Sequence, residues 1–306
     1  MVKQDHLAVD FGRGLVLKNP VMNASGTFAY GEEFSKILDL KKMGGIITKG
    51  LSLNPKEGKP TPRVAEAASG MVNAIGLENV GLEQFLKEKL PFLKGFNTPV
   101  IVNFFGNSEE EYVLMAEKLS IEGIAALEMN VSCPNVKKGG IQFGRDPEVL
   151  GELVSLVRKK TDKPLIVKLS PMSSDICRMA ASAQEAGADA LTCINTIPAM
   201  VIDEETKRPV LGNITGGLSG PAIKPVALKI VWDVSRHVGI PVIGAGGIAS
   251  YRDAIQFFLA GASAVQIGTQ LLVEPFCLPG IIEGISGYFS DHGIKRIKEI
   301  CGKLEV

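Results

Sequence analysis

The sequence repeats one pattern eight times: a short run of Val, Ile, Leu and Ala ends in polar or glycine residues, and an amphipathic stretch follows. The runs are nearly continuous in apolar residues, as expected of strands buried on both faces of a parallel sheet. Eight such units predict a closed (β/α)8 barrel. The runs are Leu15–Asn23, Gly45–Lys49, Val100–Phe104, Ala126–Val131, Leu165–Leu169, Ala190–Ile194, Pro241–Gly244 and Ala264–Ile267.

Helices are predicted between the runs from apolar spacing and from residues typical of helix ends. Ser108 is a candidate N-cap, and three glutamates follow it in the first turn, where the helix dipole favours acidic side chains. Gly187 is a candidate glycine just beyond a helix end. The predicted helices are Ser108–Leu119, Pro147–Thr161, Ser173–Ala186, Pro225–His237 and Arg252–Ala260.

The predicted fold is therefore an α/β TIM barrel with an N-terminal hairpin and long insertions after strands two, four and six, counted along the chain. Residues 1–306 are expected to form a single domain, because no linker divides them. Leu7–Leu17 predicts a hairpin that plugs the barrel floor. Ser52–Arg63 predicts a long loop, and Ile197–Gly217 predicts an insertion with a small hairpin.

Composition excludes several classes of protein. The 33 basic and 33 acidic side chains leave no formal net charge, which argues against a nucleic-acid binder. No apolar run reaches the ~18 residues of a membrane span, and the first residues contain no signal-peptide core. An odd number of cysteines at long spacings argues against a disulfide framework, so a reducing cytoplasm is the expected location.

Barrel active sites lie at the C-terminal ends of the strands. The predicted strand ends supply amides, two lysines and two glycine turns, and this composition predicts a functional site. The residues at these ends are Ser25, Lys49, Gly50, Asn103, Asn130, Lys168, Asn195, Thr196, Gly246, Gly247, Gly268 and Thr269.

The glycine turns after strands seven and eight match the usual phosphate site of a barrel, where backbone N–H groups hold an anion. Alone, such a turn is equally compatible with a structural role. The amides suit a flat polar ring, since each offers both a donor and an acceptor. The strand ends carry no carboxylate, which argues against glycosidase chemistry and a Mg²⁺ site. Three histidines, at 6, 237 and 292, are too few and too scattered for zinc.

Cys133 lies in the polar run Asn130–Asn135, just past the fourth strand. Nearby lysines could lower the pKa of its thiol, and no histidine is placed to activate it as a nucleophile. A general base is then the more natural role, because a thiol is partly ionised near neutral pH.

Several motifs together resemble the dihydroorotate dehydrogenases of pyrimidine (UMP) biosynthesis, over essentially the whole chain. The motifs are Thr48-Lys49-Gly50, Asn73-Ala-Ile-Gly-Leu77, Asn130-Val-Ser-Cys-Pro-Asn135, Val167-Lys168-Leu169-Ser170, Ile194-Asn195-Thr196, Gly216-Gly-Leu-Ser-Gly220 and Gly244-Ala-Gly-Gly247.

The resemblance implies an FMN-containing barrel that oxidises (S)-dihydroorotate to orotate. By this resemblance, Cys133 removes the C5 proton while hydride passes from C6 to flavin N5, and Lys49 contacts both flavin and substrate. It implies substrate contacts at Lys49, Asn73, Ala74, Ile75, Gly76, Leu77, Asn130, Asn135, Asn195 and Thr196. It implies flavin contacts at Ser25, Lys49, Gly50, Asn103, Asn130, Lys168, Ile194, Gly220, Gly246, Gly247, Gly268 and Thr269.

The subclass follows from the same resemblance. The base is Cys, whereas membrane-bound members use Ser and carry an N-terminal extension. The segments 23–34 and 130–143 are most similar to class 1B. That class pairs a catalytic subunit with a separate FAD and [2Fe–2S] subunit that passes electrons to NAD⁺, and it implies a homodimer core in a heterotetramer. This chain lacks the four-cysteine spacing of a cluster site, so those cofactors would belong to the partner.

Four further hypotheses stay open on the sequence alone. A class 1A enzyme would pass electrons to fumarate, and a related dihydropyrimidine dehydrogenase would use a ring without the 6-carboxylate. A lyase or aldolase barrel would use Lys49 or Lys168 as a Schiff base. A barrel that binds a phosphorylated metabolite without catalysis is the fourth.

Overall fold

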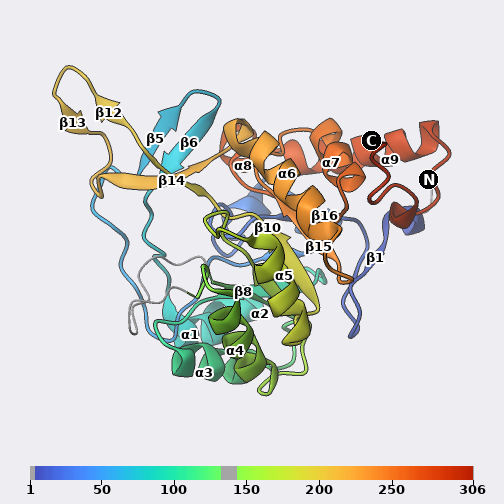
Figure 1. Ribbon diagram of the computed structural model, residues 1–306, viewed down its shortest axis with the longest axis horizontal. Helices are drawn as coiled ribbons and strands as arrows, with labels where there is room; N and C mark the ends of the chain where they lie inside the picture. The colour runs from blue at the N-terminus through green and yellow to red at the C-terminus, as the bar shows by residue number, and fades with distance from the viewer. Residues whose placement is uncertain (1–3, 132–142, 306) are drawn as a thin grey trace.

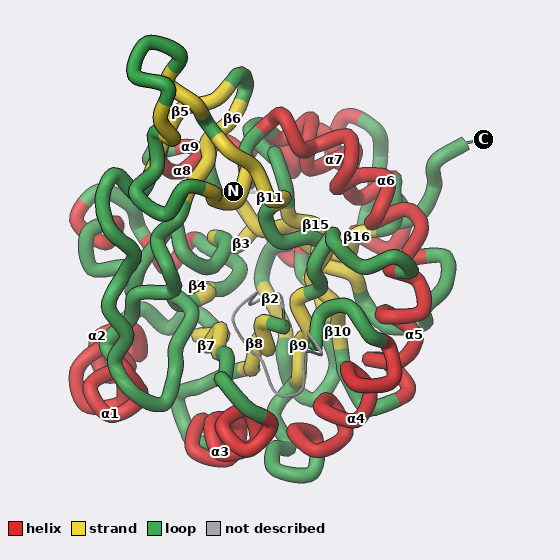
Figure 2. Tube along the Cα trace, turned by 60° about the vertical axis from the view of Figure 1, so that its left-hand side comes forward, coloured by secondary structure: helices red, strands yellow, loops and turns green. Residues whose placement is uncertain are grey.

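The computed structural model describes residues 4–131 and 143–305. Its main sheet has eight parallel strands in the order β3-β16-β15-β10-β9-β8-β7-β4, and Figure 2 shows them at the centre of a ring of helices. Each predicted run overlaps one of these strands, which confirms the barrel; β15 ends one residue after its run and β16 begins two residues before its run. They are β3 (Val21–Asn23), β4 (Ile46–Ile47), β7 (Val100–Phe104), β8 (Ala126–Asn130), β9 (Leu165–Lys168), β10 (Ala190–Cys193), β15 (Val242–Ala245) and β16 (Ala262–Ile267).

A side chain closes the barrel between β3 and β4, the two strands at the ends of the sheet order. β3 and β4 share only a short parallel bridge, at Met22 and Gly45. Beside it, the Asn23 amide donates to the Ile47 carbonyl at 2.6 Å and accepts from the Ile47 N–H at 3.0 Å. Asn23 is fully buried, and its side chain supplies the hydrogen bonds that a longer strand pair would make with backbone.

Helices follow seven of the eight barrel strands, whereas β3 is followed only by the short turns η2 (Phe34–Lys36) and η3 (Leu40–Lys42). No helix in residues 4–131 and 143–305 is both long and apolar enough to span a membrane. The helices are α1 (Gly81–Gln84), π-helical η4 (Phe85–Lys89), α2 (Leu90–Lys94), α3 (Glu109–Leu119), α4 (Pro147–Arg158), α5 (Ile176–Glu185), α6 (Lys224–Ser235), α7 (Tyr251–Leu259), α8 (Gln270–Val273) and α9 (Cys277–Asp291), with η1 (Gln4–Leu7), η5 (Pro221–Ile223) and η6 (Ile297–Glu299) as short turns.

The caps set most helix starts as the sequence predicted. The Ser108 hydroxyl accepts from the Glu111 N–H and starts α3. α5 starts three residues later than predicted, because the Asp175 carboxylate accepts from the Arg178 N–H and acts as the cap. Gly187 has φ of +103°, as expected of a residue just past a helix end.

The predicted first run divides into two strands. Val16–Leu17 (β2) pairs with Val9–Asp10 (β1) in the expected N-terminal hairpin, and β3 begins only after Pro20. The hairpin tip lies at the N-terminal ends of the barrel strands, where Arg13 donates to Asp189, the residue before β10.

A second, four-stranded antiparallel sheet with the order β11-β14-β6-β5 projects from the other end of the barrel (Figure 1). The insertion after β4 supplies one hairpin of this sheet, which begins at Val64, directly after the predicted loop Ser52–Arg63, and was not predicted. The insertion after β10 supplies the other two strands and carries the predicted small hairpin. The strands are β5 (Val64–Ala67), β6 (Gly70–Asn73), β11 (Ile197–Met200) and β14 (Thr215–Ser219), with β12 (Ile202–Asp203) and β13 (Arg208–Pro209) forming the small hairpin.

The Asp189 carboxylate joins three parts of the barrel floor. It accepts from Arg13 at 2.6 Å, from Arg158 at 2.8 Å and from the Leu165 N–H at 2.8 Å. We expect Asp189→Ala to lower the free energy of unfolding by about 2 to 3 kcal/mol, because Arg158 then stays largely buried without its carboxylate. Urea titration measures this loss.

The matched control is Glu117→Ala, which breaks an exposed pair with Lys160. It should cost under about 1 kcal/mol. Equal losses in the two variants would contradict a structural role for the Asp189 cluster.

Candidate active site

A cavity of about 970 Å³ lies at the C-terminal ends of the barrel strands, beneath the second sheet. Its volume is at the upper end of the range for small-molecule sites. It brings together nearly all of the predicted site residues that the structure describes. These are Ser25, Lys49, Gly50, Asn73, Ala74, Ile75, Gly76, Leu77, Asn130, Lys168, Ile194, Asn195, Thr196, Gly220, Gly246, Gly247, Gly268 and Thr269.

Three predicted residues are missing from this set. Cys133 and Asn135 fall outside the described residues. Asn103 lies beneath the cavity floor and is fully buried. Its Oδ1 would be 3.1 Å from a Cβ atom placed on Gly50, which does line the cavity. Among the described residues, this oxygen is the one buried side-chain polar atom without a hydrogen-bond partner.

One wall of the cavity is backbone. Gly246 and Gly247 have φ of +131° and +74°, which favours glycine, and a Cβ on Gly247 would lie 2.6 Å from the Gly220 carbonyl oxygen. α7 begins just beyond, where the Ser250 hydroxyl accepts from the Asp253 N–H and the Asp253 carboxylate accepts in return. This wall can hold an anion, and it includes the glycine turns for which the sequence analysis predicted a phosphate site.

Asp253 keeps this turn in place. Burial raises the pKa of its carboxyl, but hydrogen bonds from Lys224, Ala249 N–H and Ser250 outweigh burial and hold the pKa below its ordinary value. The folded chain therefore stabilises the ionised form of Asp253 relative to its protonated form.

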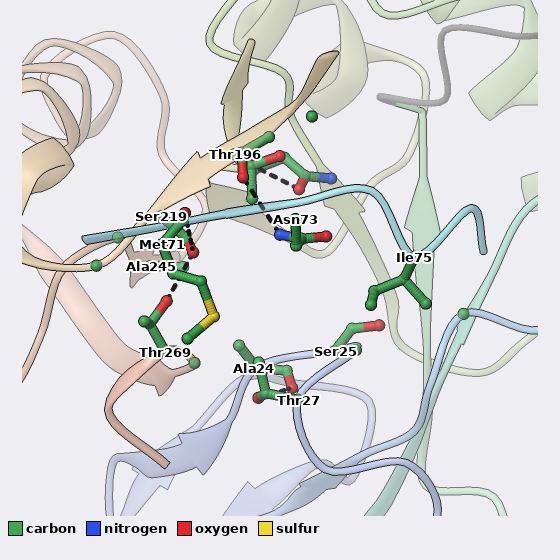
Figure 3. Close-up of a pocket in the computed structure, with 18 of the residues that line it drawn as sticks. Ala24, Ser25, Thr27, Met71, Asn73, Ile75, Thr196, Ser219, Ala245 and Thr269 are labelled. Atoms are coloured by element: carbon green, nitrogen blue, oxygen red, sulfur yellow. Dashed lines mark hydrogen bonds between the residues drawn. The ribbon is translucent and has the colours of Figure 1, made fainter. Parts of the chain in front are cut away.

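The opposite wall comes from the second sheet (Figure 3). Asn73 on β6 donates from Nδ2 to the Gly217 carbonyl at 3.3 Å, and Thr196 lies beside it on the same wall. Ser219 connects the sheet to the barrel, because its hydroxyl donates to the Met71 carbonyl and accepts from Thr269 at 2.7 Å. The side chains of Ser25 and Ile75 lie across the cavity from this connection.

The two predicted lysines occupy different environments. Lys168 is buried at the end of β9, and its Nζ lies 3.4 Å from Gln266 Oε1. Lys49 is partly exposed, and its Nζ lies 3.7 Å from Glu78, which also pairs with Arg63 at 3.1 Å. Lys49 can therefore exchange a weak ion pair for an anionic ligand.

Sequence reasoning missed two polar residues of the barrel interior. Glu128 on β8 and Gln266 on β16 are both buried, and Gln266 lines the cavity. Glu33 also lines the cavity, and Glu128 lies two residues before the end of its strand. The available signal was a charged residue inside an otherwise apolar run.

We expect Asp253→Asn to lower the free energy of unfolding by about 1 to 2 kcal/mol at pH 7, since the amide keeps one acceptor oxygen of two. The pKa of Asp253 is depressed in the folded state, so its contribution is present above the unfolded pKa of about 3.9 and is lost as pH falls through the folded value. The difference between wild type and variant should therefore stay constant from pH 7 to 5 and shrink below about pH 4. Denaturant titrations at several pH values test this, with exposed Glu122→Gln as the control. A difference that grows in acid would contradict the assignment.

The comparisons with known proteins agree with this geometry. The family model for dihydroorotate dehydrogenase matches residues 7–288. A relative from Geotalea daltonii, named "Dihydroorotate dehydrogenase B (NAD(+)), catalytic subunit", is 57% identical over 307 residues and covers 100% of both chains. A protein of the same name from Geobacter sulfurreducens is 56% identical over 294 residues, with 96% of each chain covered.

A crystal structure of DHODH from Eimeria tenella in complex with ferulenol has the same fold, with a TM-score of 0.79 at 22% identity, over 99% of this chain and 89% of that one. The comparisons confirm the predicted type of enzyme, an oxidoreductase. They favour the class 1B subunits over a class 1A enzyme, a dihydropyrimidine dehydrogenase, a Schiff-base lyase and a barrel without catalysis. The chain therefore belongs to the dihydroorotate dehydrogenase family, and its full-length similarity is to the NAD⁺-linked B-type catalytic subunits.

Proposed function

We propose that this chain oxidises (S)-dihydroorotate to orotate in pyrimidine biosynthesis, using FMN. The observation that carries the proposal is the cavity at the strand ends, which combines amides, two lysines and a glycine wall in one space. Family membership and the full-length similarity to B-type catalytic subunits support it.

The residues around the cavity fit FMN. The wall made by Gly246, Gly247 and Gly220 suits its phosphate, because backbone N–H groups at a helix start stabilise anions. Among the residues that the structure describes, no donor reaches Asn103 Oδ1, so this oxygen is available as an acceptor for a ring N–H, and Lys168 suits an electron-rich ring edge. We propose the flavin contacts implied by the sequence: Ser25, Lys49, Gly50, Asn103, Asn130, Lys168, Ile194, Gly220, Gly246, Gly247, Gly268 and Thr269.

The substrate is proposed to lie against the wall of the second sheet. Asn73, Asn195 and Thr196 there offer donors and acceptors suited to a pyrimidine ring, and the backbone from Ala74 to Leu77 extends this surface. Lys49 would exchange Glu78 for the substrate carboxylate, a charge-assisted contact worth about 1.5 to 3 kcal/mol. Asn130 and Asn135 complete the proposed set.

Cys133 is the proposed base, and its thiolate would take the C5 proton of the substrate. FMN, when bound, supplies the two-electron acceptor. The amides on the cavity wall would orient the ring for this proton transfer, and the second sheet would exclude water from it.

The proposal extends to the assembly. Electrons would reach NAD⁺ through a separate subunit that carries FAD and a [2Fe–2S] cluster. Two copies of this chain, each a single domain over residues 1–306, would form the core of a cytoplasmic heterotetramer. The similarity to NAD⁺-linked catalytic subunits supports a separate partner subunit and NAD⁺ as the acceptor.

Anaerobic mixing with dihydroorotate should bleach the visible flavin band of the purified, FMN-loaded chain. Addition of the partner subunit and NAD⁺ should then restore the band, whereas fumarate should not. A coloured protein that does not bleach would point to another substrate. A colourless chain that takes up no FMN would exclude the proposed function.

Cys133→Ala should keep FMN bound and lower turnover by about 10²- to 10⁴-fold, the usual contribution of a general base. The control is Cys177→Ala, a partly exposed thiol on α5 away from the cavity, which should turn over as wild type. Full activity of Cys133→Ala would exclude the thiol as the base.

A further inference from the structure

A carboxylate lies at the centre of the barrel, below the cavity floor. The Glu128 side chain on β8 is fully buried. Its Oε1 accepts from Asn103 Nδ2 at 2.6 Å, and its Oε2 accepts from the Thr192 hydroxyl at 2.8 Å and from Gln266 Nε2. Four strands (β7, β8, β10 and β16) thus meet at one acidic group.

Burial of this group has no evident benefit for stability. Moving a carboxylate out of water costs several kcal/mol, and apolar side chains of similar volume often stabilise a core as well or better. The hydrogen bonds from three donors offset that cost. Two of its partners lie at the cavity: Gln266 lines it, and Asn103 lies next to Gly50, which does too.

Glu128 sets the orientation of the side-chain amides of Asn103 and Gln266. An ionised carboxylate only accepts hydrogen bonds, so the amides of Asn103 and Gln266 turn their NH₂ groups to it and their oxygens away. Gln266 Oε1 then faces Lys168 Nζ at 3.4 Å. Asn103 Oδ1 then faces Gly50 on the cavity floor, without a donor among the described residues.

We propose that Glu128 is a positioning residue that sets the hydrogen-bond polarity of the cavity floor. Through Asn103 it presents an acceptor beside Gly50, and through Gln266 it holds the Lys168 ammonium in place, with its own negative charge behind both. This polarity suits a ligand ring that offers an N–H next to an electron-rich edge, as the pyrimidine part of a flavin does. The inference rests on the proposed use of FMN.

Glu128→Gln is a direct test, because it keeps the shape of the side chain and changes the polarity. The amide that it introduces has one acceptor oxygen, which cannot serve Asn103, Thr192 and Gln266 as two did. Its NH₂ group faces either Asn103 Nδ2 or Gln266 Nε2, so one of those amides must turn or lose its partner. The negative charge behind Lys168 is also removed.

The measurements are the FMN dissociation constant, from quenching of flavin fluorescence, and the midpoint potential of the bound flavin. In Glu128→Gln we expect FMN to bind about tenfold more weakly. We expect the two-electron couple to shift tenfold toward the reduced flavin, a rise of about 30 mV, because loss of a buried negative charge favours the added electrons.

Thr192→Val is the matched control. It removes one donor to the same carboxylate and a 3.3 Å acceptor of Gln266 Nε2, but it keeps the charge and the bonds from both amides to Glu128. It should lower the melting temperature while the FMN affinity and the potential stay within twofold of wild type. A wild-type affinity and potential in Glu128→Gln, or equal shifts in both variants, would overturn the inference.

If Glu128→Gln does not fold, Gln266→Met decides the question, because it removes the oxygen that faces Lys168 and leaves Asn103 and Thr192 on Glu128. We expect about tenfold weaker FMN binding, and an unchanged affinity would overturn the inference. A wild-type chain that binds FMN but does not bleach with dihydroorotate would exclude the proposed substrate and leave this inference intact. A wild-type chain that binds no FMN would overturn both.

Discussion

Closure of the barrel by Asn23 is the constraint on which the site depends. β3 has three residues and β4 has two, and their backbones are joined by one isolated parallel bridge, at Met22 and Gly45. The buried amide of Asn23 makes both missing bonds to Ile47. Because the sheet closes, all eight strands end around one opening, and the residues that follow them share one cavity.

The interior below that opening is polar where most barrels of this type are filled by branched apolar side chains. Glu128, Asn103, Thr192 and Gln266 form one hydrogen-bonded layer. Such a layer is costly if any member lacks a partner, and in the described residues the one orphaned atom is Asn103 Oδ1, on the side of the cavity. The second sheet then covers the opening, joined to the barrel through Ser219 and Thr269.

Local signals predicted the barrel well. The eight apolar runs each overlap a strand, and Ser108 caps its helix as expected. The second sheet was missed because glycines interrupt the apolar pattern of β6 and β14, and because these two strands pair across 144 residues of sequence (Asn73 with Gly217). Asn73 on β6 of this sheet was assigned to the site only through the family resemblance, since no local pattern predicts that it faces the strand ends.

The sequence by itself determined the order of strands and helices, and hence which side chains follow the strands, because periodicity and capping act over a few neighbouring residues. It also determined the family, through motifs such as Asn73–Leu77. Only the tertiary structure decided which polar side chains share the barrel interior and in which direction their amides point. The sequence presents Glu128 and Gln266 as isolated interruptions in apolar runs 138 residues apart. They become one layer only when the sheet closes, since the register of eight strands places their side chains at the same height.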